Sequence, residues 1–191
     1  PAQLDRKLLL LVLGVLPVAI VFFQHVAAMA LFLVRDHGWS EAQYGLLATL
    51  NTLLVVAFEV PLNSAMARWP ARRALPLGAV LTGVGFGLLA FADAPAMVLA
   101  AVVVWTFGEI VLFPGLNAAV ADLAPEARRG EYMGLYMMSF NLAFAIGPWA
   151  GTAVLERWGG SVLWAGAFLA ALFSAILLAR TAPAGAEGET T

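Results

Sequence analysis

The sequence has no cysteine, only two histidines and few charged residues. Without cysteine there is no disulfide framework, no thiol nucleophile and no cysteine metal site. His25 and His37 alone do not make a metal site, so no metal or other cofactor is expected. A serine nucleophile elbow and a phosphate-cradling glycine loop are also missing. We therefore expect neither an enzyme nor a nucleic-acid partner.

The scarcity of charge accompanies an excess of apolar residues. Charged residues make up 12% of the chain and apolar residues 62%, whereas ordinary soluble domains carry about 25% charged residues. A soluble core of this length cannot hide so much apolar surface, and the runs are near or above the roughly 17 to 25 residues that cross a bilayer. The sequence thus predicts an all-α membrane protein with six transmembrane helices, at about 8–34, 41–67, 74–92, 96–122, 131–155 and 161–180.

Positive charge is distributed unevenly between the two predicted faces of the membrane. If the loops alternate, only Arg35 and Arg157 lie on one side, and eight basic residues lie on the other: Arg6, Lys7, Arg68, Arg72, Arg73, Arg128, Arg129 and Arg180. The positive-inside rule then places both termini in the cytoplasm. We expect a bacterial cytoplasmic (inner) membrane and, at 181–191, a disordered cytoplasmic tail rich in Ala, Gly, Glu and Thr.

The N-terminal run has some features of a secretory signal. Arg6 and Lys7 precede an apolar stretch, and Ala28-Met29-Ala30 has the small-x-small pattern of a cleavage site. The run is too long for the apolar region of a signal peptide, which favours a membrane span. The chain begins at Pro1 rather than at Met, which suggests a fragment or a processed piece.

Polar residues are concentrated in four of the six spans. The third and sixth spans contain nothing more polar in their interiors than Thr82 and Ser174. Two polar helices followed by one apolar helix, repeated twice, is the pattern of a 3+3 inverted repeat around a wet cavity. Chance placement among six helices is the alternative. We expect the third and sixth spans to form the outer scaffold.

The fourth span contains one acidic residue, Glu109, far from other charges. A carboxylate near the bilayer centre costs roughly 2.5 to 3.5 kcal/mol on insertion scales, and a rise of about 1.5 Å per residue places Glu109 near the midplane. Because low dielectric disfavours the charged form, the carboxyl is expected to take up and release protons. Trp105, Phe113 and Asn117 recur every four residues around it and share its helical stripe. The alternative is that Glu109 pairs with His25 or an Asn and locks helices together.

Other polar or aromatic residues of the polar spans complete the candidate proton and substrate site. Gln24 and His25 are adjacent, so their side chains cannot face the same way, and His25 is either a hydrogen-bonded packing residue or a proton relay. The site candidates besides the Glu109 stripe are Gln24, His25, Asn51, Tyr136 and Asn141.

A second set of candidates belongs to gates and loops. Glu59 lies near the cytoplasmic end of its span, where substrate contact and anchoring of a basic loop are equally good interpretations, with one of three arginines as its partner. Pro148, directly after Gly147, is a kink point for gating. Gly83, Gly85 and Gly87, and Gly147 with Gly151, provide small faces for close helix packing. The gate and loop candidates are Glu59, Asn63, Arg68, Arg72, Arg73, Gly147 and Pro148.

These residues resemble the C-terminal six-helix half of the major facilitator superfamily. The segment 63–73 is similar to the basic loop pattern G-x-x-x-D-R-x-G-x-R-R, with Asn63, Ala67 and Pro70 as departures. Gly108-Glu109 followed by Pro114 is similar to the tenth helix of drug:proton antiporters and proton-coupled peptide transporters. The segment 147–151 resembles the antiporter G-P-x-x-G element, which properly belongs to the fifth helix. The membrane Arg that the fourth helix of antiporters usually carries is not present.

The resemblance implies alternating access, with the first, second, fourth and fifth spans facing a central cavity. It also implies a partner, an N-terminal six-helix half on the same or a separate chain, with small-molecule substrate and protons bound between the halves. Export of small amphipathic organic compounds is the first hypothesis. Proton-coupled peptide or nutrient uptake is the second, with Glu109 then meeting a substrate amine. A six-helix module acting as a homodimer or non-transporting partner is the third.

Overall fold

Helices account for all regular secondary structure in residues 5–182, the part of the chain that the computed structural model describes. Six helical stretches are long and apolar enough to cross a membrane, which confirms the predicted all-α class with six candidate spans. The expected disordered tail lies largely outside the described residues. The long helices are α1 (Arg6–Phe22), α3 (Glu41–Met66), α4 (Ala71–Leu88), α5 (Pro95–Leu123), α6 (Arg129–Trp158) and α7 (Gly160–Thr181).

The first expected span is not one continuous α-helix. After α1 the chain forms a 3-10 turn, η1 (Phe23–Val26), then the short α2 (Ala28–Ala30) and a π-helical segment, η2 (Leu31–Asp36). Ala27 breaks the helical backbone, with φ −138° and ψ −56°. The break follows Gln24, whose side-chain amide donates to the carbonyl oxygen of Ile20 at 2.8 Å. A side chain that occupies a helix carbonyl competes with the regular backbone ladder.

Helix boundaries follow local sequence signals. Ser40 and Gln43 form a reciprocal capping box at the start of α3, with the Gln43 N–H 3.2 Å from Ser40 Oγ and the Ser40 N–H 2.9 Å from Gln43 Oε1. Gly159 has a φ of +82°, and this residue alone separates α6 from α7. Such a left-handed backbone is easily adopted only by glycine, so the abrupt reversal depends on that residue.

Close backbone contacts hold α4 against its neighbours. A Cβ added to Gly85 would lie 2.5 Å from the backbone nitrogen of Trp105 on α5, and one added to Gly83 would lie 2.7 Å from Cβ of Ala171 on α7. Gly108 of α5 approaches equally closely, since its Cβ would lie 2.5 Å from the backbone nitrogen of Thr82. The expected close packing of the glycine-rich third span is therefore present. We call α1, α4, α5 and α7 the packed block.

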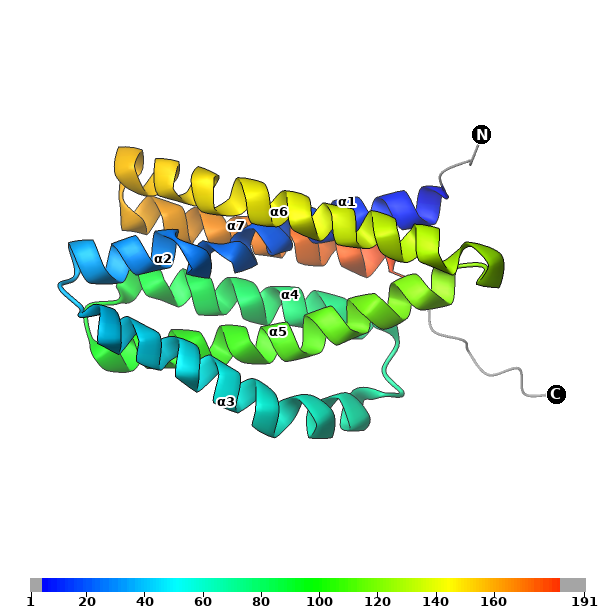
Figure 1. The fold of residues 1–191 in the computed structure, drawn as a ribbon, viewed down its shortest axis with the longest axis horizontal. Helices are drawn as coiled ribbons and strands as arrows, with labels where there is room; N and C mark the ends of the chain where they lie inside the picture. The colour runs from blue at the N-terminus through cyan, green and yellow to red at the C-terminus, as the bar shows by residue number, and fades with distance from the viewer. Residues whose placement is uncertain (1–4, 183–191) are drawn as a thin grey trace.

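Helix α3 lies at the edge of the bundle and diverges from α4 and α5 toward its C-terminal end (Figure 1). Leu47 is its one fully buried residue. Large apolar side chains such as Val56 and Val60 remain about three-quarters exposed, at 75% and 73%. Helix α3 therefore presents most of its surface outside this bundle. Lipid tails or another protein surface can cover such apolar side chains.

Candidate functional site

Glu109 lies at the centre of α5, with fourteen residues of the helix on either side. Its Oε2 accepts a hydrogen bond of 2.8 Å from Nδ2 of Asn51 on α3. The same Nδ2 donates to Oγ1 of Thr106 at 3.0 Å, and the Thr106 hydroxyl donates to the carbonyl oxygen of Val102 at 2.7 Å. Thr106 is fully buried, whereas Asn51 and Glu109 are half-buried. One amide thus joins a carboxyl group and a hydroxyl group of α5 to α3.

This triad combines the two interpretations of Glu109. The structure contains the interhelical contact that the locking alternative required, with Asn51 rather than His25 as partner. The contact also leaves the carboxyl partly exposed, so proton binding remains compatible with it. Thr106 was not among the residues singled out from the sequence. Its spacing of one helical turn before Glu109 is the signal that would have found it.

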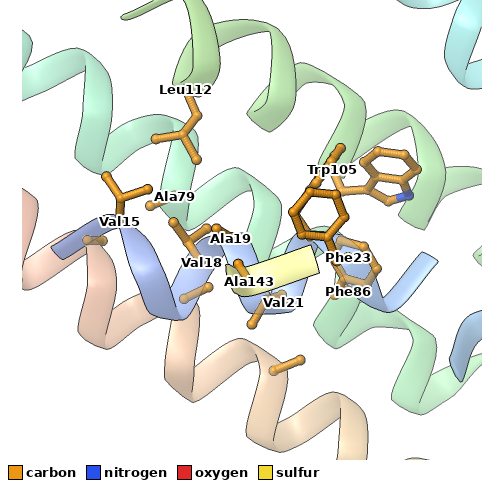
Figure 2. Close-up of a cluster of buried hydrophobic side chains, with 14 of the residues drawn as sticks. Val15, Val18, Ala19, Val21, Phe23, Ala79, Phe86, Trp105, Leu112 and Ala143 are labelled. Atoms are coloured by element: carbon orange, nitrogen blue, oxygen red, sulfur yellow. The ribbon is translucent and has the colours of Figure 1, made fainter. Parts of the chain in front are cut away.

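Aromatic side chains of α1, η1 and α4 pack against the α5 stripe. Trp105 packs on Phe86 with ring centroids 5.5 Å apart and on His25 at 5.7 Å, and Figure 2 shows Phe86 near Trp105. Phe113 makes an edge contact with Phe22 at 4.7 Å. Two of the predicted stripe residues therefore belong to one aromatic cluster, with Glu109 between them on the helix.

His25 fits the packing interpretation of the sequence. Its Nδ1 lies 2.6 Å from the carbonyl oxygen of Phe22, and its ring stacks on Trp105 at an angle of 14°. The His25 carbonyl oxygen accepts a hydrogen bond from the Tyr44 hydroxyl of α3. The residue thus joins the interrupted first span to both α3 and α5, while no hydrogen bond joins its ring to Glu109 within residues 5–182.

Gln24 faces away from His25, as their adjacency predicts, and contacts α6. Its Nε2 donates to the carbonyl oxygen of Gly147 at 2.9 Å. A Cβ on Gly151 would lie 1.5 Å from Gln24 Oε1, and one on Gly147 would lie 3.0 Å from the Ile20 carbonyl oxygen. The two glycines therefore make room for the end of α1 and for the buried Gln24 amide on η1. Pro148 lies inside α6, which continues through it to Trp158.

The remaining cavity candidates are dispersed. Tyr136 is buried on α6, with its ring 6.1 Å from that of Phe140. Asn117 and Asn141 are exposed on α5 and α6. The structure therefore does not bring either asparagine to Glu109.

Of the two interpretations of Glu59, anchoring of the basic loop finds no ion pair in the described residues. Glu59 is exposed, and no salt bridge within 4.0 Å joins it to an arginine in the described part of the chain. Asn63 donates to the Glu59 carbonyl oxygen of its own helix at 2.8 Å. The three loop arginines, Arg68, Arg72 and Arg73, are exposed and border a groove. Across residues 5–182, no group of three or more potential metal ligands is found.

Comparison with known proteins gives several distant relatives. The chain is 28% identical over 116 residues to an uncharacterized MFS-type transporter, YqjV, of Bacillus subtilis, covering 61% of this chain and 28% of that protein. It is 27% identical over 164 residues to the multidrug resistance protein MdtH of Proteus mirabilis, covering 84% and 41%. It is 26% identical over 120 residues to a Na⁺, Li⁺, K⁺/H⁺ antiporter of Planococcus maritimus, covering 61% and 28%.

The chain spans less than half of the length of each of these relatives. Two of these names describe a transporter or an antiporter, and the identities are too low to transfer a substrate. The sequence profile of the Major Facilitator Superfamily matches residues 11–190, nearly the whole chain. Together with six candidate membrane spans, this match establishes the family and half of its fold. This protein belongs to the Major Facilitator Superfamily of secondary transporters.

Proposed function

We propose that the chain is the C-terminal six-helix half of a proton-coupled transporter that exports small amphipathic organic compounds by alternating access. The observation that carries the proposal is the hydrogen bond between Asn51 of α3 and Glu109 at the centre of α5. An acid within a span is costly and usually marks an ion or substrate pathway. Here the acid contacts α3, whose one buried residue is Leu47.

Proton binding at Glu109 would change the strength of the contact between α3 and α5. When the carboxyl is ionised, the Asn51 amide makes a charge-assisted hydrogen bond, which is roughly twice as strong as a neutral one. Protonation removes the charge and weakens this bond. Because α3 has few other buried contacts, a change at this bond can bias the position of α3. The proton thereby selects between two arrangements of the helices.

The substrate class follows from the surroundings of the acid and from the relatives. Trp105 and Phe113 flank Glu109 on the helical stripe, and aromatic rings with one acid suit amphipathic organic cations. The name of the MdtH relative supports multidrug export. The name of the Planococcus relative supports exchange of inorganic cations for protons. That exchange is the second candidate, favoured by the carboxylate and hydroxyl oxygens around Asn51.

The topology of the proposal follows the positive-inside distribution. Both termini and the loop with Arg68, Arg72 and Arg73 would lie in the cytoplasm of a bacterial cell. The N-terminal six-helix half would form the other wall of the substrate site. A cysteine placed beside Arg72 should then react with an impermeant maleimide only after the membrane is opened.

The Glu109→Gln variant tests the proposal in the intact transporter, reconstituted in proteoliposomes with an imposed pH gradient. We expect proton-driven transport of ethidium to be lost, because glutamine keeps the hydrogen-bonding shape without binding a proton. Glu126→Gln is the matched control, since Glu126 is exposed in the loop before α6, away from Glu109, and forms no salt bridge within 4.0 Å among the described residues, and it should retain flux. Size-exclusion profiles check that both variants fold.

The flux measurements separate the two candidate substrates and test the role of Glu109. Ethidium flux that needs Glu109 supports organic export, whereas proton-linked flux of Na⁺ or K⁺ without ethidium flux supports the inorganic alternative. Equal pH-driven flux by Glu109→Gln and the parent protein would overturn the role of Glu109 in coupling.

A further inference from the structure

An apolar groove of about 500 Å³ lies between the second half of α3 and helices α4 and α5. Within residues 5–182, the side chains of α3 beyond Asn51 make hydrogen bonds only to their own helix, as Asn63 and Ser64 do. Apolar contacts such as that between Phe58 and Phe107, with centroids 5.4 Å apart, remain. The lining of this groove includes Met66, Trp69, Leu81, Phe107 and Val111.

A second groove, of about 1120 Å³, continues the first toward the loop between α3 and α4. Met66, Trp69 and Val111 line both grooves, so the two are contiguous. The charged residues of the second groove are one carboxylate, Asp122, and the three loop arginines, Arg68, Arg72 and Arg73. None of these arginines forms a salt bridge within 4.0 Å in the described part of the chain. The combined surface is therefore apolar along the helices and basic at their ends.

We propose that the combined groove binds one anionic phospholipid, with an acyl chain along α3, α4 and α5 and the phosphate at the loop arginines. The basic end coincides with the ends of two candidate spans, Met66 and Ala71, which is the level of lipid headgroups. Trp69 lies between these ends, as tryptophan does at membrane interfaces. Basic pockets between transmembrane helices bind anionic headgroups, and the adjoining apolar groove accommodates the chain.

Charge favours a lipid over a protein segment as the occupant. Three arginines and one aspartate line the second groove, so its net charge is positive. An occupant with a negative group at one end and hydrocarbon at the other matches the basic second groove and the apolar first groove. The lipid would also fill the space that α3 leaves as it diverges from α4 and α5 (Figure 1). This proposal does not rest on proton coupling, because the grooves are not lined by Glu109.

Native mass spectrometry of the intact protein in detergent tests the headgroup. The probes are palmitoyl-oleoyl phosphatidylglycerol and the phosphatidylcholine with the same chains. We expect phosphatidylglycerol to be retained at about tenfold or more lower concentration, because each arginine near an anionic headgroup contributes to binding. The variant Arg68→Gln/Arg72→Gln/Arg73→Gln should lose this preference. The control variant Arg128→Gln/Arg129→Gln/Arg180→Gln carries the same charge change and should keep it.

The apolar arm is tested by Leu81→Trp, which fills the first groove and leaves the arginines in place. We expect weaker retention of phosphatidylglycerol by a variant that still elutes as one symmetrical peak. Equal retention of the two lipids by the parent protein, or equal losses in both arginine variants, would overturn the proposal. A benzophenone attached at Leu81→Cys should crosslink to phosphatidylglycerol. Crosslinking to another part of the intact protein alone would show that protein fills the groove and would also overturn it.

Discussion

Helices α3 and α4 are neighbours in sequence and differ in how they are held. Helix α4 packs by backbone contact, since the glycines that face α5 and α7 leave no space for a Cβ. Helix α3 exposes most of its surface and is joined to the rest through side chains, the Tyr44 hydroxyl and the Asn51 amide. Backbone packing of small residues gives a rigid unit, whereas a few side-chain hydrogen bonds allow rearrangement. The contrast separates a packed block from a helix that can shift.

The acid lies where these two regions meet. Glu109 belongs to α5 in the packed block, and its hydrogen-bond donor belongs to α3. A proton that binds at this boundary changes a contact between the rigid part and the loosely held part. Such a position converts local electrostatics into movement more directly than a position within the packed block would.

The largest effect is expected from Gly85→Ala, which tests the packed block. The new Cβ would lie 2.5 Å from the backbone nitrogen of Trp105 and 2.8 Å from the carbonyl oxygen of Ala101, and backbone atoms cannot rotate away. Overpacking of this kind costs about 1 to 3 kcal/mol. We expect a clear drop in the thermal midpoint, measured as monodisperse protein remaining after heating in detergent.

The matched control for this change is Gly45→Ala on α3. A Cβ at Gly45 meets no atom within 4 Å, and alanine is a better helix former than glycine. Its thermal midpoint should stay the same or rise. Similar losses for Gly45→Ala and Gly85→Ala would show that the two helices are held alike and would remove the contrast between them.

Much of this arrangement is predictable from the sequence. The apolar runs gave six candidate spans, and Ser40 with Gln43 marks the start of α3. Runs of apolar residues do not show a helix interruption, so the break at Ala27 was not predicted. The Gln24 amide before the break bonds both to the Ile20 carbonyl oxygen and to the Gly147 carbonyl oxygen of α6. The second contact joins positions far apart in the chain and leaves no local pattern.

The candidate site was predictable in part. A lone acid in an apolar run identifies Glu109, and the four-residue spacing identifies Trp105 and Phe113 as its helical neighbours. The donor to Glu109 depends on which face α3 presents to α5, and α3 has polar residues on a broad face. Asn51 therefore was one candidate among several, and the structure pairs it with Glu109. Asn117 shares the periodicity but lies where α5 is exposed.

A moderate effect is expected from Asn51→Ala, which removes the side-chain bond between α3 and α5. Interhelical hydrogen bonds in membranes contribute about 0.6 kcal/mol on average and at most about 1.7. We expect a smaller loss of thermal stability than for Gly85→Ala, together with a broader distance distribution between spin labels at Ala57→Cys and Val162→Cys. The first label lies on α3 and the second on α7.

Asn63→Ala is the control for this change, because Asn63 bonds only to the Glu59 carbonyl oxygen of its own helix. It should leave the spin-label distances unchanged. An identical distribution in Asn51→Ala and the parent protein would mean that apolar contacts alone fix α3, and that the Glu109 bond does not hold it.

The smallest effect is expected at the exposed end of η2, shortly before α3. The Arg35 guanidinium donates to both carboxylate oxygens of Asp36, at 2.7 and 3.2 Å, and this contact holds the pKa of Asp36 below its ordinary value of 3.8. A carboxyl whose pKa is lowered by folding stabilises the folded state above its unfolded pKa. That stabilisation is lost as the pH falls through the lower, folded pKa.

Asp36→Asn should therefore lower the thermal midpoint slightly at neutral pH, and the difference from the parent protein should vanish in acid below the folded pKa of Asp36. Added salt should shrink the difference as well, because the pair is exposed and screened. The stability lost in Asn51→Ala should respond little to salt, since that bond lies within the span. A salt-insensitive effect of Asp36→Asn that persists in acid would show that the Arg35–Asp36 ion pair is not what stabilises the end of η2. The two ends of the comparison, the exposed pair and the Asn51 bond within the span, would then respond to salt alike.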